Sequence, residues 1–438
     1  MDYSHPKGER IKVAISRQKA TDREMRRGAL FWNPGGPGGS GLKTRDGKSA
    51  PKEQFKNSGL NTVYDLIGFD PRGIGESTPL HCEKVEELPP IVSRPTDADF
   101  EVFAAWGKKS EDACDKVDGQ KRRFFNTRNT ARDMDIMRAA LNEKKINYVG
   151  YSYGTYLGAV YGSMFAAHLD RSVLDSSMHP DLTGRPYMIS KAKGVRRNVE
   201  VWASWVAERD KTFGLGTTRG EVMETVETVS AQLAQDPVGF WTQSMFDLGM
   251  GDSQHWSTWI ELAERVAALR DGEDPGIDLT ADAAASKQRE LTEEAKYTIL
   301  SEGDWPSDLD TYREDVRNNR DRYPYGLGIN DFMPHPPAFR SFTPPEKPTD
   351  IQRDGYPRGL VVQAERDVNT PYEGGVAMAD RLDHILLTVQ DGQHGQYLDQ
   401  GNACVDQQVA AYLLRGILPS GPVTCAGGDS PPDVPTDA

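Results

Sequence analysis

A serine between two glycines is the strongest chemical signal in the sequence. The segment Gly150-Tyr151-Ser152-Tyr153-Gly154 has the pattern G-x-S-x-G, between an apolar stretch at 146–149 and a helix-forming stretch at 155–167. Glycines at these positions permit a tight turn between a strand and a helix, which exposes the serine hydroxyl at the edge of a sheet. A glycine turn with no chemical role is the alternative, but the strand–turn–helix context favours Ser152 as a nucleophile.

A nucleophilic serine requires a base, and His394 is our candidate. In this arrangement the chain order is serine, acid and then histidine, so the base is expected downstream of Ser152. His394 lies in a glycine-containing loop, 391–395, that follows a predicted strand at 385–389. Such a loop lets an imidazole reach the sheet edge, although a solvated loop histidine is the alternative. Three other downstream histidines are less well placed, because two belong to a predicted insertion and one stands between a helix and a strand: His255, His335 and His384.

The histidine needs a carboxylate to orient it, and Asp367 fits this role. Asp367 follows a predicted strand at 360–363 and precedes Thr370-Pro371, so it also lies in a loop at a strand end. One helix and one strand fit between Asp367 and His394. Asp391 is the competitor, but it lies in the same loop as the histidine and is better explained as a turn residue. We expect Asp367 to fix the tautomer of His394 and to stabilise the imidazolium.

A glycine-rich loop near the N-terminus could supply amide donors to an oxyanion. The loop from Asn33 to Gly41 follows an early predicted strand, which is where a hydrolase of this kind places its second oxyanion donor. A phosphate-binding loop is the rival interpretation, because Gly47-Lys48-Ser49 follows. Its register is wrong, since Leu42 stands where the first glycine is required, and Pro34 and Pro37 lack amide donors.

These residues must be positioned by a framework of alternating strands and helices. The predicted strands at 11–15, 28–32, 64–69 and 146–149 alternate with helical stretches, and after 342–348 the strand–helix pattern returns. This alternation predicts an α/β fold with a mostly parallel sheet that is covered on both faces.

The organisation of the chain follows from where this alternation stops. Residues 1–180 are predicted to form the first part of the core, and 181–345, rich in charged helical stretches and tryptophan, to form an inserted helical cap. Residues 346–426 then complete the core. The tail, 427–438, consists mainly of Gly, Asp, Ser and Pro and is predicted to be disordered.

Composition excludes several classes of function. The 438 residues carry a formal charge of −14 and contain no apolar run long enough to span a membrane. The acidic balance, without a compensating basic patch, argues against a nucleic-acid partner. The chain begins Met1-Asp2-Tyr3, without the basic and apolar segments of a secretion signal.

The four cysteines fall into two sequence-local pairs, Cys82 with Cys114 and Cys404 with Cys425. None has the C-x2-C spacing of a zinc or redox site. Two disulfides would indicate an oxidising compartment, and four buried thiols are the alternative.

Taken together, the motifs resemble those of the secreted actinobacterial tripeptidyl aminopeptidase and proline iminopeptidase group of α/β-hydrolases. The resemblance covers both ends of the chain and the spacing between them, and is weak in the insertion. The stretches that carry it are Asn33 to Gly41, Gly68-Phe69-Asp70-Pro71-Arg72-Gly73-Ile74-Gly75-Glu76-Ser77, Gly150 to Thr155, Asp367-Val368-Asn369-Thr370-Pro371 and Gly392 to Gly395.

The resemblance implies an α/β-hydrolase fold with a helical cap and a catalytic triad of Ser152, Asp367 and His394. It also implies an oxyanion hole formed by the amides of Gly36 and Tyr153, both disulfides, and an exported enzyme. No metal and no organic cofactor is expected.

The expected activity is removal of tripeptides from free peptide N-termini through an acyl-enzyme. Members of the family bind the substrate ammonium through acidic cap residues, commonly in a segment with a cysteine shortly before an acid. Here the segment 301–306 lacks that cysteine, and Glu302 and Asp304 are the candidate amine-binding residues. The alternatives are an esterase or amidase with the same triad and, more remotely, a non-catalytic binding protein on a hydrolase scaffold.

Overall fold

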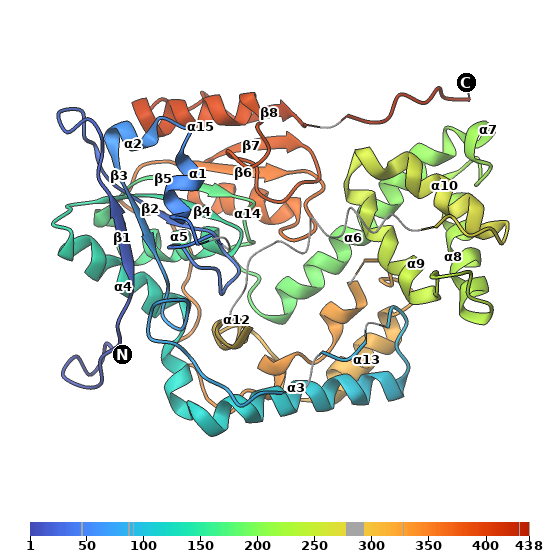
Figure 1. Ribbon diagram of the computed structural model, residues 1–438, viewed down its shortest axis with the longest axis horizontal. Coiled ribbons are helices and arrows are strands. Elements are labelled where there is room, and N and C mark those ends of the chain that lie inside the picture. Colours follow the sequence, from blue (N-terminus) through green and yellow to red (C-terminus); the bar gives the residue numbers. More distant parts are fainter. Residues whose placement is uncertain are drawn as a thin grey trace.

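An eight-stranded sheet forms the centre of the molecule in the computed structural model, which describes residues 1–44, 47–85, 88–90, 92–276, 293–326, 328–428 and 430–437 (Figure 1). The strand order is β1-β3-β2-β4-β5-β6-β7-β8. β1 is antiparallel to β3, and the other neighbouring strands are parallel. The strands are β1 (Ile15–Gln18), β2 (Gly28–Asn33), β3 (Tyr64–Phe69), β4 (Ile146–Tyr151), β5 (Leu169–Asp175), β6 (Leu360–Ala364), β7 (Ile385–Gln390) and β8 (Val423–Ala426).

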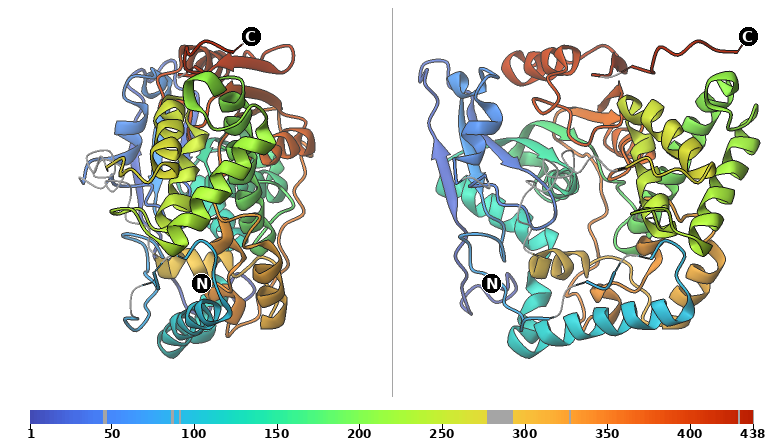
Figure 2. Two further views of the ribbon diagram at one scale, coloured as in Figure 1. Left: turned by 90° about the vertical axis from the view of Figure 1, so that its right-hand side faces the viewer. Right: turned by 45° about the vertical axis from the view of Figure 1, so that its right-hand side comes forward.

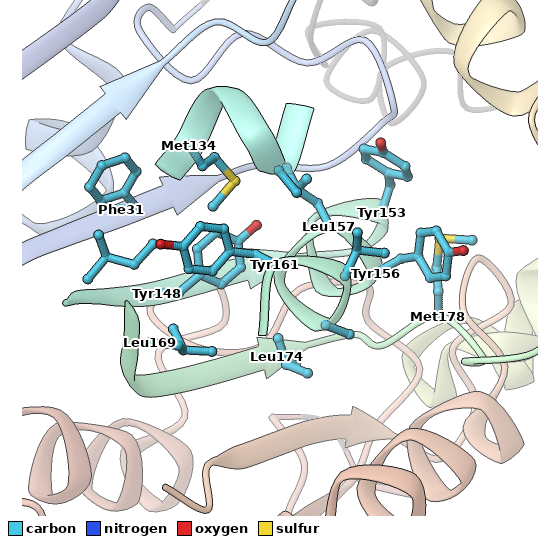
Figure 3. Packing of buried hydrophobic residues seen from close by; sticks show 14 of the residues in the cluster. Phe31, Met134, Tyr148, Tyr153, Tyr156, Leu157, Tyr161, Leu169, Leu174 and Met178 are labelled. Carbon is cyan, nitrogen blue, oxygen red and sulfur yellow. The ribbon is translucent and has the colours of Figure 1, made fainter. Parts of the chain in front are cut away.

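Both faces of the sheet are buried beneath helices, which explains why its inner strands are apolar without alternation. On β2, Phe31 belongs to one apolar cluster, whereas Leu30 and Trp32 belong to the cluster on the other face. The first cluster includes residues of α4 (Thr127–Ala140), α5 (Tyr153–Met164) and α14 (Tyr372–Leu382), and Figure 3 shows Tyr148, Leu157 and Tyr161 packed within it. The second cluster includes residues of α1 (Ala50–Phe55), α2 (Leu60–Val63) and α15 (Ala403–Arg415). The predicted α/β-hydrolase fold is thus confirmed.

The inserted cap has its own apolar core around the fully buried Trp202. In Figure 1 its helices α7 to α10 lie on the side of the molecule away from β1. The cap helices are α6 (Arg185–Ala207), α7 (Asp210–Phe213), α8 (Arg219–Gln235), α9 (Gln243–Gly249), α10 (Trp259–Arg270), α12 (Glu293–Leu300) and α13 (Leu309–Asn319).

A long helix from the first part of the chain joins the cap rather than the sheet. The helix α3 (Asp97–Val117) buries Phe100 and Phe103 in a cluster with Tyr312 of α13 and other cap residues. Arg317 of α13 forms an ion pair with Asp97 at the start of α3. The right-hand view of Figure 2 shows α3, in cyan, running along the lower edge of the molecule and reaching beneath the cap helices. The helix α3 therefore packs with the helices of 181–345, the segment that was predicted to form the cap.

Two edges of the sheet differ from the sequence-based expectation. The first strand begins at Ile15, not at residue 11, because its register with β3 pairs Ile15 with Phe69 and Gln18 with Leu66. At the other edge, β8 was not predicted; its Cys425 forms a disulfide with Cys404 of α15.

The C-terminal tail, predicted to be disordered, lies against the cap in the structure. Val434 packs on the cap cluster, and its carbonyl accepts a hydrogen bond from Arg209 Nε at 2.8 Å. The amide of Asp437 donates to Glu208 O. Residues 429 and 438 of this tail lie outside the described residues. No helix within the described ranges is long and apolar enough to cross a membrane.

Candidate active site

Ser152 occupies the sharp turn between β4 and α5. Its backbone has φ 58° and ψ −126°, which is unusual for a residue with a side chain. The flanking glycines are required by packing: a Cβ on Gly150 would lie 2.4 Å from Gly154 O, and one on Gly154 would lie 2.7 Å from Asn33 O. The predicted strand–turn–helix arrangement is therefore present, with the serine at its apex.

His394 and Asp367 are in direct contact. His394 Nδ1 lies 2.8 Å from Asp367 Oδ2, and the Asp367 side chain is fully buried. Asp367 also accepts hydrogen bonds from the amides of Asn369 and Thr370 and from the Thr370 hydroxyl, at 2.8, 3.1 and 2.7 Å. Because this carboxylate accepts, we assign the proton of the neutral imidazole to Nδ1, which leaves Nε2 as the basic nitrogen.

The loop that carries His394 is bound from the core side by a second buried carboxylate. Asp175, at the end of β5, accepts hydrogen bonds from the amides of Gln396 and Tyr397, the latter at 2.6 Å. The neighbouring Ser176 Oγ accepts one from the Gly395 amide at 2.8 Å. Burial raises the pKa of Asp175 to about 7. This carboxylate therefore helps to position the backbone immediately after the histidine.

The loop that carries Asp367 is bound from the cap side, mainly by α6. Asn198 Nδ2 donates to Arg366 O at 2.8 Å, and the Tyr187 hydroxyl donates to Asn369 O at 2.5 Å. The guanidinium of Arg366 lies 3.7 Å from the centre of the Trp256 ring. Two residues of the acid loop are thus held by one cap helix.

A single cap carbonyl contacts the loop that carries Asp367 and the loop that carries His394. Gln254 O accepts a hydrogen bond from Arg366 Nε at 3.1 Å, next to Asp367. The same oxygen would lie 1.8 Å from a Cβ placed on Gly392, two residues before His394. The cap is therefore in close contact with both the acid loop and the histidine loop.

Ser152 and His394 open into one cavity of about 760 Å³. This volume lies within the range of small-molecule sites. Further lining residues come from the glycine-rich loop, the segment after β5, the cap, the loop of Asp367 and the segment after His394: Gly36, Pro37, Met178, Tyr187, Met188, Lys191, Lys296, Tyr297, Leu300, Trp305, His335, Asn369, Asp399 and Gln400.

The glycine-rich loop lies against the serine turn, as an oxyanion hole requires. A Cβ on Gly35 would lie 2.4 Å from Tyr151 O and 3.2 Å from the Tyr153 nitrogen. Gly36 lines the cavity, and Tyr153 begins helix α5, where backbone amides lack helical acceptors. Gly36 therefore lines the same cavity as Ser152, and Tyr153 follows the serine directly. The role of their amides in an oxyanion hole stays a prediction.

The two candidate amine-binding carboxylates do not line the cavity. Glu302 accepts a hydrogen bond at 3.0 Å from the amide of Thr127, at the start of α4, and another from its hydroxyl. Burial raises the pKa of Glu302 to about 7. Asp304 is exposed, and its backbone pairs with Gly184. Their role in amine binding stays a prediction.

The competing residues have other surroundings. Asp391 accepts hydrogen bonds from the amides of Gly392 and Gln393, as a turn residue does. His384 is buried beside Ser172, and burial lowers its pKa to about 3. His335 lines the cavity but is held by Asn330 O, and burial lowers its pKa to about 4. Within the described ranges, no three His, Cys, Asp or Glu side chains are grouped to hold a metal ion.

Both cysteine pairs are joined in the structure. The disulfide Cys82–Cys114 connects the segment before α3 to that helix, and Cys404–Cys425 connects α15 to β8. Disulfides of this kind are typical of oxidising compartments.

Several residues that support the site escaped the sequence analysis. Thr370 could have been identified, because it stands in the quoted segment from Asp367 to Pro371. Asp175 and Asn198 gave no local signal, since their contacts are with residues far away in the sequence.

Comparison with known proteins assigns the chain to a family. A family model described as "TAP-like protein" matches residues 331–425, which include Asp367 and His394. Tripeptidyl aminopeptidase of Streptomyces coelicolor is 35% identical, and the alignment covers 98% of this chain and 82% of that protein. Carboxylesterase B of Mycobacterium tuberculosis is 30% identical, with 97% and 85% covered. Serine protease Hip1 of the same species is 28% identical, and the alignment covers 97% of this chain and 85% of that protein. The chain therefore belongs to the tripeptidyl aminopeptidase family of α/β-hydrolases and is a serine hydrolase.

Proposed function

We propose that this protein is an exopeptidase that releases tripeptides from free peptide N-termini, with Ser152, Asp367 and His394 as its triad. The observation that carries the proposal is the 35% identity to a tripeptidyl aminopeptidase over 98% of the chain. The cavity of about 760 Å³ beside Ser152 and His394 supports it, because a site of that size accommodates a short peptide.

The mechanism follows from the hydrogen bonds at the site. Asp367 holds the Nδ1–H of His394, so Nε2 accepts the proton of Ser152 Oγ as this oxygen attacks the substrate carbonyl. The amides of Gly36 and Tyr153 donate to the oxyanion of the tetrahedral intermediate. His394 then returns the proton to the leaving amine, and an acyl-enzyme remains on Ser152.

Deacylation repeats these steps with water. His394 removes a proton from the water, whose oxygen attacks the acyl carbonyl, and the proton then passes to Ser152 Oγ as the acid product leaves. No other group is needed for proton transfer.

The proposal is tested with a free-amine tripeptide aminocoumarin, Ala-Pro-Ala, and its N-acetylated form. We expect the free-amine form to be cleaved at least about 100-fold faster, because an exopeptidase uses binding energy from the terminal ammonium. Single-residue aminocoumarins test the substrate length, and Ser152→Ala, which removes the nucleophile, is the blank. Equal cleavage of both tripeptides would refute the exopeptidase proposal.

An esterase acting on small acyl groups is the second candidate. The 30% identity to a carboxylesterase favours it, and the same triad would serve. Cleavage of a nitrophenyl ester without cleavage of either tripeptide would establish this alternative.

We further propose that the enzyme is exported. The two disulfides support this, because cytosolic reductants keep most thiols reduced. Fractionation of the native host followed by thiol labelling tests it; a cytosolic protein with free thiols would contradict the proposal.

A further inference from the structure

Two lysines of the cap line the cavity that contains Ser152. Lys191 comes from α6 and Lys296 from α12, so two different cap helices each contribute a lysine to the wall of one cavity. Both residues are half-buried. Neither was singled out by the sequence analysis, because an isolated lysine on a charged helix is usually a solvated surface residue.

Lys191 has a carboxylate partner behind the cavity wall. Its Nζ lies 3.4 Å from Asp331 Oδ1, and a quarter of the Lys191 side chain remains exposed. Asp331 is buried and does not line the cavity. Burial raises the pKa of Asp331, and the charges of Lys191 and Lys296 oppose this shift.

The other charged groups of the cavity wall belong to the core. Asp399, in the histidine loop, is the carboxylate among the described lining residues, and it accepts a hydrogen bond from Gln54 Nε2 at 2.9 Å. On the cap side, His335 adds no charge at neutral pH, because burial lowers its pKa to about 4. Among the described lining residues, the cap therefore contributes two lysines, whereas the carboxylate is at the sheet edge.

A cationic wall discriminates between substrates. A carboxylate that replaces water beside a half-buried ammonium gains more Coulomb energy than it would at an open surface, and a cationic group is repelled there. An amide of the same shape gains little. A cavity with this wall therefore favours an acyl group that carries a negative charge.

We propose that Lys191 and Lys296 form a subsite for a carboxylate in the acyl part of the substrate. In a peptide substrate this carboxylate is the side chain of a glutamate or aspartate within the released tripeptide, an assignment that rests on the proposed exopeptidase function. In an ester substrate it is the free acid of a dicarboxylic acyl group.

The first test compares free-amine tripeptide aminocoumarins that differ only in charge, with Glu or Gln at one of the three positions in an Ala-Pro-Ala background. At one position we expect kcat/KM to be about tenfold higher for Glu, which is the discrimination of one ion pair in a partly buried site. This preference should diminish at high ionic strength. Equal rates for Glu and Gln at all three positions would overturn the proposal.

The lysines are tested by substitution at Lys296, and Lys191 is kept because its Nζ pairs with the buried Asp331. Lys296→Gln should lower the Glu-to-Gln ratio several-fold, and Lys296→Glu should make a Lys-containing peptide better than the Glu peptide. Lys193→Gln is the matched control, since Lys193 is exposed on α6 and does not line the cavity. An unchanged ratio in folded Lys296→Glu, or the same loss in Lys193→Gln, would contradict the assignment.

The design separates this proposal from the exopeptidase proposal. If free-amine peptides are cleaved without a charge preference, the carboxylate subsite fails and the exopeptidase stands. If no peptide is cleaved, the exopeptidase fails, and the mono-nitrophenyl ester of adipic acid is compared with its primary-amide analogue. The same comparison can be made without turnover: we measure how well glutarate and glutaramide each protect Ser152 from reaction with a fluorophosphonate. A preference for the acid in either assay supports the subsite. Equal behaviour of the acid and the amide in both assays overturns it.

Discussion

The loops at the sheet edge and the cap wall face the same cavity but are built differently. Asp367 accepts three hydrogen bonds besides that of His394, and the backbone after His394 is bound by Asp175 and Ser176. The cap wall, in contrast, consists of side chains that project from helices, among them Lys191 and Lys296. We therefore expect the edge to determine the chemistry and the cap wall to influence which acyl group is accepted.

This division has a physical basis. Proton transfer and attack require reacting atoms to be placed within fractions of an ångström, which dense hydrogen bonding provides. Discrimination between substrates needs only a difference in affinity, which a side chain on a helix can supply. Changes at the edge should therefore lower kcat, and changes in the cap wall should alter relative kcat/KM.

The largest effect after loss of the nucleophile is expected for Asp367→Asn. An asparagine can donate its amide N–H to Nδ1, which favours the tautomer with the proton on Nε2 and removes the base; kcat should fall about 10⁴-fold. The measurement is the steady-state rate with the enzyme concentration determined by fluorophosphonate titration of Ser152.

Asp391→Asn is the matched control for this change. Asp391 lies in the histidine loop and, among the described residues, its carboxylate accepts from the amides of Gly392, Gln393 and Gly428. An asparagine oxygen can still accept from Gly392 and Gln393, so only the hydrogen bond from Gly428 is lost. We expect its kcat to remain within about tenfold of the wild type. Equal losses in the two variants would show that loop geometry, rather than the charge of Asp367, determines the rate.

The contact between the edge and the cap tests whether the two regions are independent. Gly392→Ala introduces a Cβ that would overlap Gln254 O, so the histidine loop or the cap segment must move. A displacement of about 1 Å near His394 should lower kcat about 10- to 100-fold. Gly421→Ala is the control, because a Cβ there meets no atom within 4 Å. Wild-type kcat in Gly392→Ala, with only KM changed, would place the effect in the cap alone.

Much of the edge could be predicted from the sequence because its signals are local. Ser152, Asp367 and His394 each stand in a loop directly after an apolar strand, and parallel strands bring such loops to one edge. The fold followed from the same alternation of strands and helices. The position of β1 was less well predicted, because the edge strand is short and its polar residues pair with β3.

The remaining features depend on contacts that no local pattern encodes. The apolar spacing of Phe100 and Phe103 indicates a helix, but not that its apolar face packs on the cap. Likewise, the contact of Gln254 with Gly392 and the pairing of Lys191 with Asp331 join residues more than 100 positions apart. The cavity wall could therefore be described only from the structure.

The smallest expected effect on turnover, but a measurable one on stability, is that of Glu302→Gln. Burial raises the pKa of Glu302 to about 7, so the folded protein keeps the proton between about pH 4.5 and 7 while the unfolded chain releases it. The stability that Glu302 contributes is therefore greatest below pH 4.5 and is lost as the pH rises through 7. Glutamine does not ionise, and Glu302→Gln should be more stable than the wild type above pH 7 by about 2 kcal/mol.

Thermal unfolding from pH 5 to 8 measures this difference, and Asp304→Asn is the control because Asp304 is exposed nearby. The Tm of the wild type should fall relative to Glu302→Gln as the pH rises, whereas Asp304→Asn should follow the wild type. Parallel curves for wild type and Glu302→Gln would mean that Glu302 is ionised throughout. In that case a charged carboxylate would be available beside Thr127, and a higher KM of Glu302→Gln for free-amine peptides alone would assign it to the substrate ammonium.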